Sequence, residues 1–235
     1  MPRTRIKICG ITRPEDAALA ADLGADAIGL NFFAGPRRID RDAAHRIGDT
    51  VSTLVTLVGL TDRYLDIDRG QGLAVRDLMG GYPALRLMVF QTYGIDLDKV
   101  GDPGVSYECW PVFRVQSRNF AVDIQVAVEV DTLRGIWPHT VTAIVLDTAV
   151  KGQLGGTGQT FNWNWIAEAR AAGELEGLPP IILAGGLTPD NVAEAIRVAR
   201  PYAVDVSSGV EFPNQPGKKD PARVKAFIEA VRSTD

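Results

Sequence analysis

The stretch "RIKICGITRPEDAALAADLGADAIGLNFF" (5–33) places two apolar runs around a segment of helical character. The runs "RIKIC" and "DAIGLNF" are short and rich in isoleucine and leucine, as buried strands are. The alanine-rich segment 14–23 between them opens on a proline, which is favoured in the first turn of a helix. Strands joined by a helical crossover lie parallel. The stretch therefore predicts one strand–helix–strand unit of a parallel sheet.

The same alternation continues to the end of the chain. Six further apolar runs predict strands: "TLVTLVGL", "LRLMVF", "CWPVFRV", "VTAIVLD", "PPIILAG" and "AVDVSS". Further helices are predicted over 41–49, 161–172, 189–199 and 221–232. Helix boundaries within 61–119 are unclear. Eight strands in an uninterrupted chain of this length favour an α/β fold, a single (βα)8 TIM barrel over 1–235, rather than an open doubly wound sheet.

Charge and cysteine usage exclude several classes of function. The formal net charge is −4 and the chain has no dense basic run, which argues against a nucleic-acid partner. The start "MPRTRIKICG" lacks the apolar core of a signal peptide, and no segment has the roughly 18 apolar residues of a membrane span. A cytoplasmic location with no membrane partner is expected. Cys9, Cys109, His45 and His139 form no metal-ligand pattern, so no metal site is predicted.

Glycine-rich turns follow the last three predicted strands, at the face where barrel enzymes place their active sites. Exposed backbone N–H groups in such turns attract anions, and the loops after strands seven and eight often hold phosphate. For any one turn, a tight chain reversal is the commoner explanation, but three together favour a phosphorylated ligand. The candidate residues are Gly156, Thr157, Gly158, Gly185, Gly186, Ser208 and Gly209.

Strand alternation orients the first predicted strand, because successive residues point to opposite faces. Ile6 and Ile8 should face the surrounding helices, so Lys7 and Cys9 are expected inside the barrel. Closure makes the first and last strands neighbours. We therefore expect an interior ion pair between Lys7 and Asp205, which either satisfies itself or has a role toward the substrate.

Asp147 ends the apolar run "AIVLD" at the mouth of the predicted barrel. A carboxyl group there can act as a general acid if its pKa lies above the usual value of about 3.9. Cys9, across the mouth, can act as a base if its pKa falls below about 8.5. A single cysteine is more often a small buried apolar residue. Spacing along the sequence leaves both interpretations of Cys9 open.

Seven blocks follow one another in a recognisable order along the chain. The first two are "KICGITRPEDAALAADLGADAIGLNFF" and "GPRRI". The later blocks are "LDT", "GGTGQTFNW", "LAGGLTPDNVAEAI", "DVSSGVE" and "PGKKD". Together they resemble the phosphoribosylanthranilate isomerase family of tryptophan biosynthesis, over the first quarter and the last two-fifths of the sequence.

The resemblance implies a barrel of the ribulose-phosphate-binding type that needs no cofactor. It would catalyse the Amadori rearrangement of N-(5-phosphoribosyl)anthranilate to 1-(2-carboxyphenylamino)-1-deoxyribulose 5-phosphate. Cys9 matches the general base that removes the C2 proton of a ring-opened Schiff base, and Asp147 matches the general acid that protonates the furanose oxygen. Arg37, after the proline of "GPR", matches the arginine that binds anthranilate. We add Asp205 and Ser207, on the last strand, to the substrate-binding candidates. The partner is a small phosphorylated molecule, bound by a monomer or a homodimer.

The sequence departs from the family pattern at several positions. Tyr93 stands in "QTYG" where the family commonly has Q-L-H-G, so the role of this position is open. Gly35 replaces a serine, and Gln159 and Asn162 stand where lysine and aspartate are usual. None of these changes affects Cys9, Asp147 or the phosphate-binding candidates.

Three other functions stay open. The aldose–ketose isomerase of the histidine pathway acts on another sugar phosphate, but it would want a carboxylate in place of Cys9. Indole-glycerol-phosphate synthase would need a lysine acid and a glutamate pair at strand ends, and no block of the sequence matches these. A non-catalytic descendant that binds a phosphorylated ligand would keep the glycine-rich loops and lose turnover.

Overall fold

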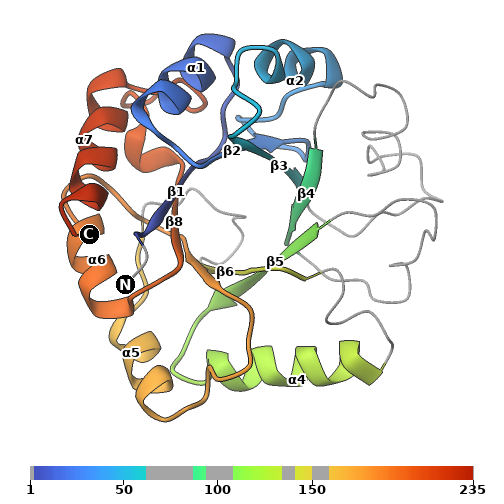
Figure 1. Cartoon of the computed structure of the whole chain (residues 1–235), viewed down its shortest axis with the longest axis vertical. Helices are drawn as coiled ribbons and strands as arrows, with labels where there is room; N and C mark the ends of the chain where they lie inside the picture. The colour runs from blue at the N-terminus through green and yellow to red at the C-terminus, as the bar shows by residue number, and fades with distance from the viewer. Residues whose placement is uncertain (1–2, 62–86, 94–107, 134–140, 150–158, 235) are drawn as a thin grey trace.

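Eight parallel strands close into a barrel in the computed structural model, which describes residues 3–61, 87–93, 108–133, 141–149 and 159–234. Neighbouring strands pair in sequence order, and the last strand pairs with the first (Figure 1). The strands are β1 (Arg5–Ile8), β2 (Ala27–Asn31), β3 (Thr56–Thr61), β4 (Leu87–Thr92), β5 (Glu108–Val115), β6 (Ile144–Thr148), β7 (Ile181–Leu183) and β8 (Ala203–Val206). The predicted closed barrel is confirmed. That residues 1–235 form one domain stays a prediction.

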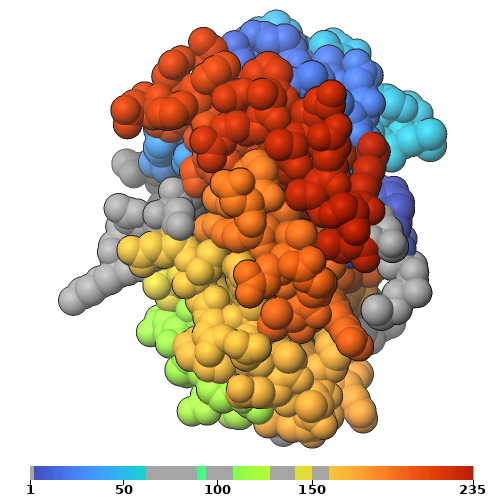
Figure 2. All heavy atoms as spheres, turned by 90° about the vertical axis from the view of Figure 1, so that its left-hand side faces the viewer, coloured from blue at the N-terminus to red at the C-terminus, as the bar shows by residue number. Residues whose placement is uncertain are grey.

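The described helices lie outside the barrel, along its upper, left and lower sides in the view of Figure 1. They are α1 (Pro14–Leu23), α2 (Arg41–Gly48), α4 (Phe120–Leu133), α5 (Asn164–Ala171), α6 (Val192–Ala199) and α7 (Pro221–Arg232), and a short 3-10 helix, η2 (Ser208–Val210), follows β8. Figure 2 shows α7, α6 and α5 side by side across one face of the molecule. None of the helices in the described part of the chain is long and apolar enough to cross a membrane.

The helices predicted at 14–23 and 221–232 have the bounds that the structure gives to α1 and α7. Both have strong terminal signals. Pro14 opens α1, and Gly24 ends it with a φ of 98°. Asp220 caps α7 by accepting a hydrogen bond from the backbone N–H of Ala222 at 2.9 Å. Helices α5 and α6 begin later than predicted, at Asn164 and Val192.

Helix α4 has no counterpart among the helices predicted from the sequence. Its residues "FAVDIQVAVEVDTL" are rich in valine and alternate in part between apolar and polar, which is typical of strands. In the structure Ala121 and Ile124 are buried at helical spacing, whereas Val122 and Val126 are exposed. Packing on the barrel therefore overrides the local preference of this segment. Of the stretch 61–119, residues 62–86 and 94–107 lie outside the described part of the chain.

The apolar core has a layer outside the barrel and two clusters inside it. Ile6 and Ile8 belong to the outer layer, between the strands and the helices. Lys7 lies opposite Asp205 in the register of β1 and β8 and is 1 % exposed. The interior clusters are Cys9, Ala27, Val58, Leu60 and Val89, and Ala143, Val145, Ile182, Ala184 and Ala203. The predicted alternation, with isoleucines outward and Lys7 and Cys9 inward, is confirmed.

Candidate active site

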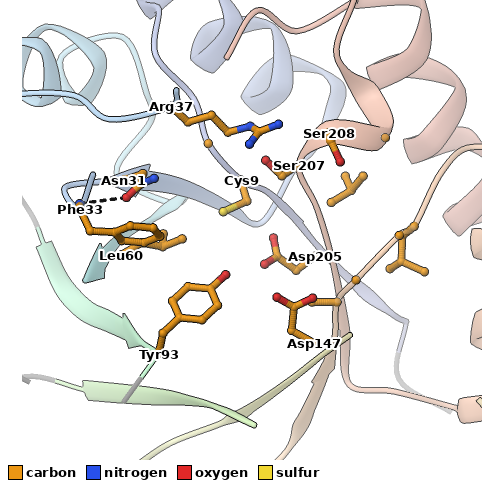
Figure 3. A pocket seen from close by; sticks show the side chains of 17 residues that line it. Cys9, Asn31, Phe33, Arg37, Leu60, Tyr93, Asp147, Asp205, Ser207 and Ser208 are labelled. Atoms are coloured by element: carbon orange, nitrogen blue, oxygen red, sulfur yellow. Dashed lines mark hydrogen bonds between the residues drawn. The ribbon is translucent and has the colours of Figure 1, made fainter. Parts of the chain in front are cut away.

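A pocket lies at the carboxyl ends of the strands, where barrel enzymes carry out their chemistry (Figure 3). It is lined by nine of the residues predicted from the sequence: Cys9, Arg37, Asp147, Gly185, Gly186, Asp205, Ser207, Ser208 and Gly209. The other three candidates, Gly156, Thr157 and Gly158, lie outside the described residues. Residues that are far apart in the sequence therefore meet in one space.

A buried ion pair lies at the base of this pocket. Lys7 Nζ donates a hydrogen bond to Asp205 Oδ2 at 2.9 Å, and both side chains are buried, so the predicted pair is confirmed. Burial acts to lower the pKa of Lys7, but Asp205 and Cys9 together outweigh this effect, and the pKa is raised. The second oxygen, Asp205 Oδ1, is buried and accepts no hydrogen bond from a described residue. That oxygen is an acceptor available to a ligand.

Cys9 directly follows β1 and points into the pocket (Figure 3). A Cβ atom on Gly29 would lie 2.7 Å from Cys9 Sγ and 3.1 Å from Lys7 Nζ, so glycine is what leaves room for both groups. Burial raises the pKa of the Cys9 thiol, and the Asp205 carboxylate adds to this effect, whereas Lys7 opposes it. The lowered pKa that the sequence argument required of a base is therefore not found, because the loss of hydration exceeds the effect of the nearby ammonium group.

Asp147 lies in β6 and is 5 % exposed. Its Oδ1 atom accepts a hydrogen bond from the backbone N–H of Thr148 at 2.8 Å. Burial raises the pKa of Asp147 to about 6, and the nearby Asp205 carboxylate contributes to the rise. The pKa of Asp147 therefore lies above that of an ordinary aspartate, as a general acid requires. This carboxyl group keeps its proton closer to neutral pH than an exposed aspartate does.

The turns after β7 and β8 form one side of the pocket. Gly185 and Gly186 follow β7, and Ser208 and Gly209 open η2. Within the described ranges, the backbone N–H groups of Gly186, Ser208 and Gly209 donate no hydrogen bond to another residue. Several unpaired N–H groups in one concave surface suit an anion such as phosphate.

Arg37 enters the pocket from the loop after β2. Gly10 has a φ of 69°, and a Cβ atom there would lie 2.5 Å from Arg37 Cδ, so glycine allows the arginine to cross the end of β1. Arg37 Nε and Nη2 donate to the two carboxylate oxygens of Glu211, at 2.8 and 2.7 Å. Glu211 also accepts from Lys219 Nζ at 2.9 Å. Glu211 ends the block "DVSSGVE" and Lys219 lies in "PGKKD", but neither pattern predicts a role for these residues.

An aromatic pair forms the wall of the pocket opposite the glycine-rich turns. Phe33 and Tyr93 pack edge to face, with ring centroids 5.5 Å apart. Figure 3 shows the Tyr93 hydroxyl pointing toward the space between the carboxylates. Burial raises the pKa of Tyr93 well above its usual value, so the phenol is neutral. In the described residues no group of three or more His, Cys, Asp or Glu side chains could hold a metal ion.

The fold and the pocket are those of a (βα)8-barrel protein with a thiol and two carboxyl groups at the strand ends. The family model described as "N-(5'phosphoribosyl)anthranilate (PRA) isomerase" matches residues 113–230. An N-(5'-phosphoribosyl)anthranilate isomerase of Pseudomonas fluorescens is 39% identical over 236 residues, which cover 100% of this chain and 99% of the relative. The chain belongs to the phosphoribosylanthranilate isomerase family.

Solved structures agree with this assignment. The phosphoribosyl anthranilate isomerase of Thermotoga maritima superposes with a TM-score of 0.74 at 29% identity, over 98% of this chain and 99% of that one. The enzyme of Thermus thermophilus gives 0.73 at 30% identity, over 99% and 100%. A third, in complex with reduced 1-(o-carboxyphenylamino)-1-deoxyribulose 5-phosphate, gives 0.71 at 28% identity, over 98% and 99%. The similarity therefore extends over almost the whole barrel.

Proposed function

We propose that Cys9 and Asp147 carry out the proton transfers by which this chain isomerises N-(5'-phosphoribosyl)anthranilate to 1-(2-carboxyphenylamino)-1-deoxyribulose 5-phosphate, in tryptophan biosynthesis. The observation that supports the proposal is a pocket in which a thiol from the β1 side and a carboxyl group from the β6 side face the same space. Substrate ring opening needs an acid, and the following enolisation needs a base.

Asp147 acts first, as the general acid. Its proton passes to the furanose ring oxygen, the bond between that oxygen and C1 breaks, and the amine nitrogen shares its electron pair with C1 to give a protonated Schiff base. The pKa of about 6 leaves a protonated fraction of Asp147 near neutral pH. A well-placed acid of this kind contributes about 10²–10⁴-fold to the rate.

Cys9 then acts as the general base. Its thiolate removes the proton from C2, the electrons of that C–H bond form the C1=C2 double bond, and the pair of the C1=N bond returns to nitrogen. The resulting enol becomes the ketone when C1 gains a proton and the C2 hydroxyl loses one. The cationic Schiff base next to Cys9 would favour its thiolate, which offsets the raised pKa of the thiol in the pocket alone.

The remaining lining residues suit the other groups of this substrate. The turns that contain Gly185, Gly186, Ser208 and Gly209 offer backbone N–H groups to the phosphate. Asp205 Oδ1 offers an acceptor to a sugar hydroxyl. The guanidinium of Arg37 suits the anthranilate carboxylate, because its planar fork matches two carboxylate oxygens.

Location and assembly are further parts of the proposal. We propose that the protein is cytoplasmic, as expected from the sequence. One solved structure, at 29% identity, is described as generated monomers of the dimeric phosphoribosylanthranilate isomerase of Thermotoga maritima. For the present chain both a monomer and a homodimer fit the proposed chemistry, and light scattering on the purified protein decides between them.

Turnover of the substrate itself tests the proposed function. Phosphoribosylanthranilate is generated in the cuvette from anthranilate and phosphoribosyl pyrophosphate by a coupling enzyme, and its fluorescence is followed after this protein is added. We expect a rapid, protein-dependent loss of fluorescence. Substrate binding without loss of fluorescence would instead indicate a non-catalytic protein that binds a phosphorylated ligand.

A further inference from the structure

A buried charged cluster lies beside the pocket and has no part in the two proton transfers. It consists of Arg37, Glu211 and Lys219, and Lys219 is fully buried while Glu211 is 6 % exposed. Arg37 comes from the loop after β2, whereas Glu211 and Lys219 form a short antiparallel bridge between η2 and α7. Burying a charged side chain costs free energy, so either contacts within the cluster or a function must account for these buried charges.

The geometry leaves one edge of the Arg37 guanidinium open. Glu211 occupies the edge formed by Nε and Nη2, with hydrogen bonds of 2.8 and 2.7 Å. Nη1 donates no hydrogen bond to a residue in the described ranges. Because the guanidinium is planar, fixing one edge also fixes the direction of the other. The second edge, formed by Nη1 and Nη2, can therefore receive a second carboxylate.

Lys219 balances the charge of Glu211. Its Nζ atom lies 2.9 Å from Glu211 Oε1 and also donates to the carbonyl oxygen of Ser207 at 3.1 Å. The backbone N–H of Gly217 donates to the same Glu211 oxygen at 3.0 Å. Within the cluster, two cations and one carboxylate leave a single net positive charge. Glu211 thus holds the arginine without cancelling its attraction for an anion.

We propose that Glu211 positions Arg37, with Lys219 as its counterion, so that the outer guanidinium edge binds the aromatic carboxylate of the substrate. The inference rests on the proposed function, since it deepens the role given there to Arg37. Glu211 touches no reacting atom and acts through Arg37. When the guanidinium is already fixed, binding of a carboxylate costs less side-chain entropy than when it must order a mobile arginine.

The competing explanation is a structural one. Thr12 Oγ1 donates to the carbonyl oxygen of Gly217 at 2.7 Å, and the backbone N–H of Lys219 donates to Asp16 Oδ2 at 3.1 Å. The cluster therefore also lies where hydrogen bonds connect the segment after η2 with the start of α1. If Glu211 only stabilises this connection, its loss should weaken the binding of every ligand equally. If Glu211 positions Arg37, its loss should weaken only ligands that carry the carboxylate.

Two ligands separate these explanations. One is reduced 1-(o-carboxyphenylamino)-1-deoxyribulose 5-phosphate, and the other is the same molecule without the carboxyl group. Calorimetry gives Kd for each with wild type, Glu211→Gln and the surface control Glu229→Gln. We expect wild type and the control to prefer the carboxylate by about 10–100-fold, the range of a charged, bidentate hydrogen bond. In Glu211→Gln this preference should fall by roughly tenfold or more, while Kd of the ligand without the carboxyl group changes by less than about threefold.

Three outcomes would overturn the inference or what it rests on. An unchanged preference in folded Glu211→Gln would overturn it, and so would an equal loss of affinity for both ligands. If wild type itself shows no preference, the role proposed for Arg37 fails instead. Glu211→Gln leaves Lys219 as an uncompensated buried charge, so the double variant Glu211→Gln/Lys219→Met, which removes both charges, is measured beside it and should show the same loss of preference.

Discussion

Cys9→Ala is expected to lower kcat by about 10²–10⁴-fold, because it removes the base that takes the C2 proton. The thiol lies in the pocket with Asp147, and alanine keeps the small apolar volume that the interior cluster needs at this position. Kd for the reduced product analogue should change little, since the phosphate and carboxylate contacts remain. The measurement is the fluorescence assay with saturating substrate, with circular dichroism as the check of folding.

Cys109→Ala is the matched control. Cys109 is also buried but lies in β5, next to Thr92 and outside the pocket lining. It should keep kcat within about threefold of wild type, since Cys109 lies in the apolar core and does not line the pocket. If Cys9→Ala is folded and turns over at the wild-type rate, the base is another group.

Asp147→Asn is expected to cause a loss of similar size, about 10²–10⁴-fold in kcat, because an amide cannot protonate the ring oxygen. Asparagine is nearly isosteric, and its oxygen can still accept the hydrogen bond from the backbone N–H of Thr148. The variant should therefore fold and bind the product analogue. Single-turnover fluorescence at saturating protein separates the chemical step from binding.

Asp123→Asn serves as the control for the loss of a carboxylate. Asp123 is exposed on α4, away from the pocket lining. Its variant should have the wild-type kcat. A folded Asp147→Asn that retains most of its turnover would mean that the ring opens by itself or by means of a different acid.

The barrel could be predicted from the sequence because its signals are local. Alternating apolar runs and helices gave the number of strands, and parallel pairing with closure follows from that alternation. Helix α4 was missed because valine-rich segments favour strands until the neighbouring barrel supplies a surface for Ala121 and Ile124 to bury. Local preference carries no information about such a surface.

The site could be predicted only in part. Cys9 and Asp147 stand at strand ends, and Lys7 and Asp205 become neighbours once the barrel closes, so strand alternation was enough to bring these residues together. The direction of the Cys9 pKa depends on how far burial outweighs Lys7, and sequence spacing does not contain that balance.

The Arg37–Glu211–Lys219 cluster was missed for a different reason. It joins two loops that are far apart in the sequence. Arg37 was expected to contact the substrate, but the glutamate after "SSGV" and the lysine pair of "PGKKD" look like ordinary loop charges. Their pairing depends on side-chain directions that only the folded barrel sets.

The central claim, that a protonated Asp147 and a deprotonated Cys9 act together, is tested most directly by kcat/KM of wild type and Asp147→Asn across about pH 5–8. In the wild type, a rise in pH through about 6 removes the acid proton while it increases the thiolate, so the two effects cancel and kcat/KM levels off. In the variant only the thiolate titrates, and kcat/KM should keep rising. The wild-type to variant ratio is therefore expected to be constant below pH 6 and to fall by about tenfold per pH unit above it. Titration of the substrate phosphate cancels in this ratio. A ratio that is independent of pH over the whole range would contradict the claim.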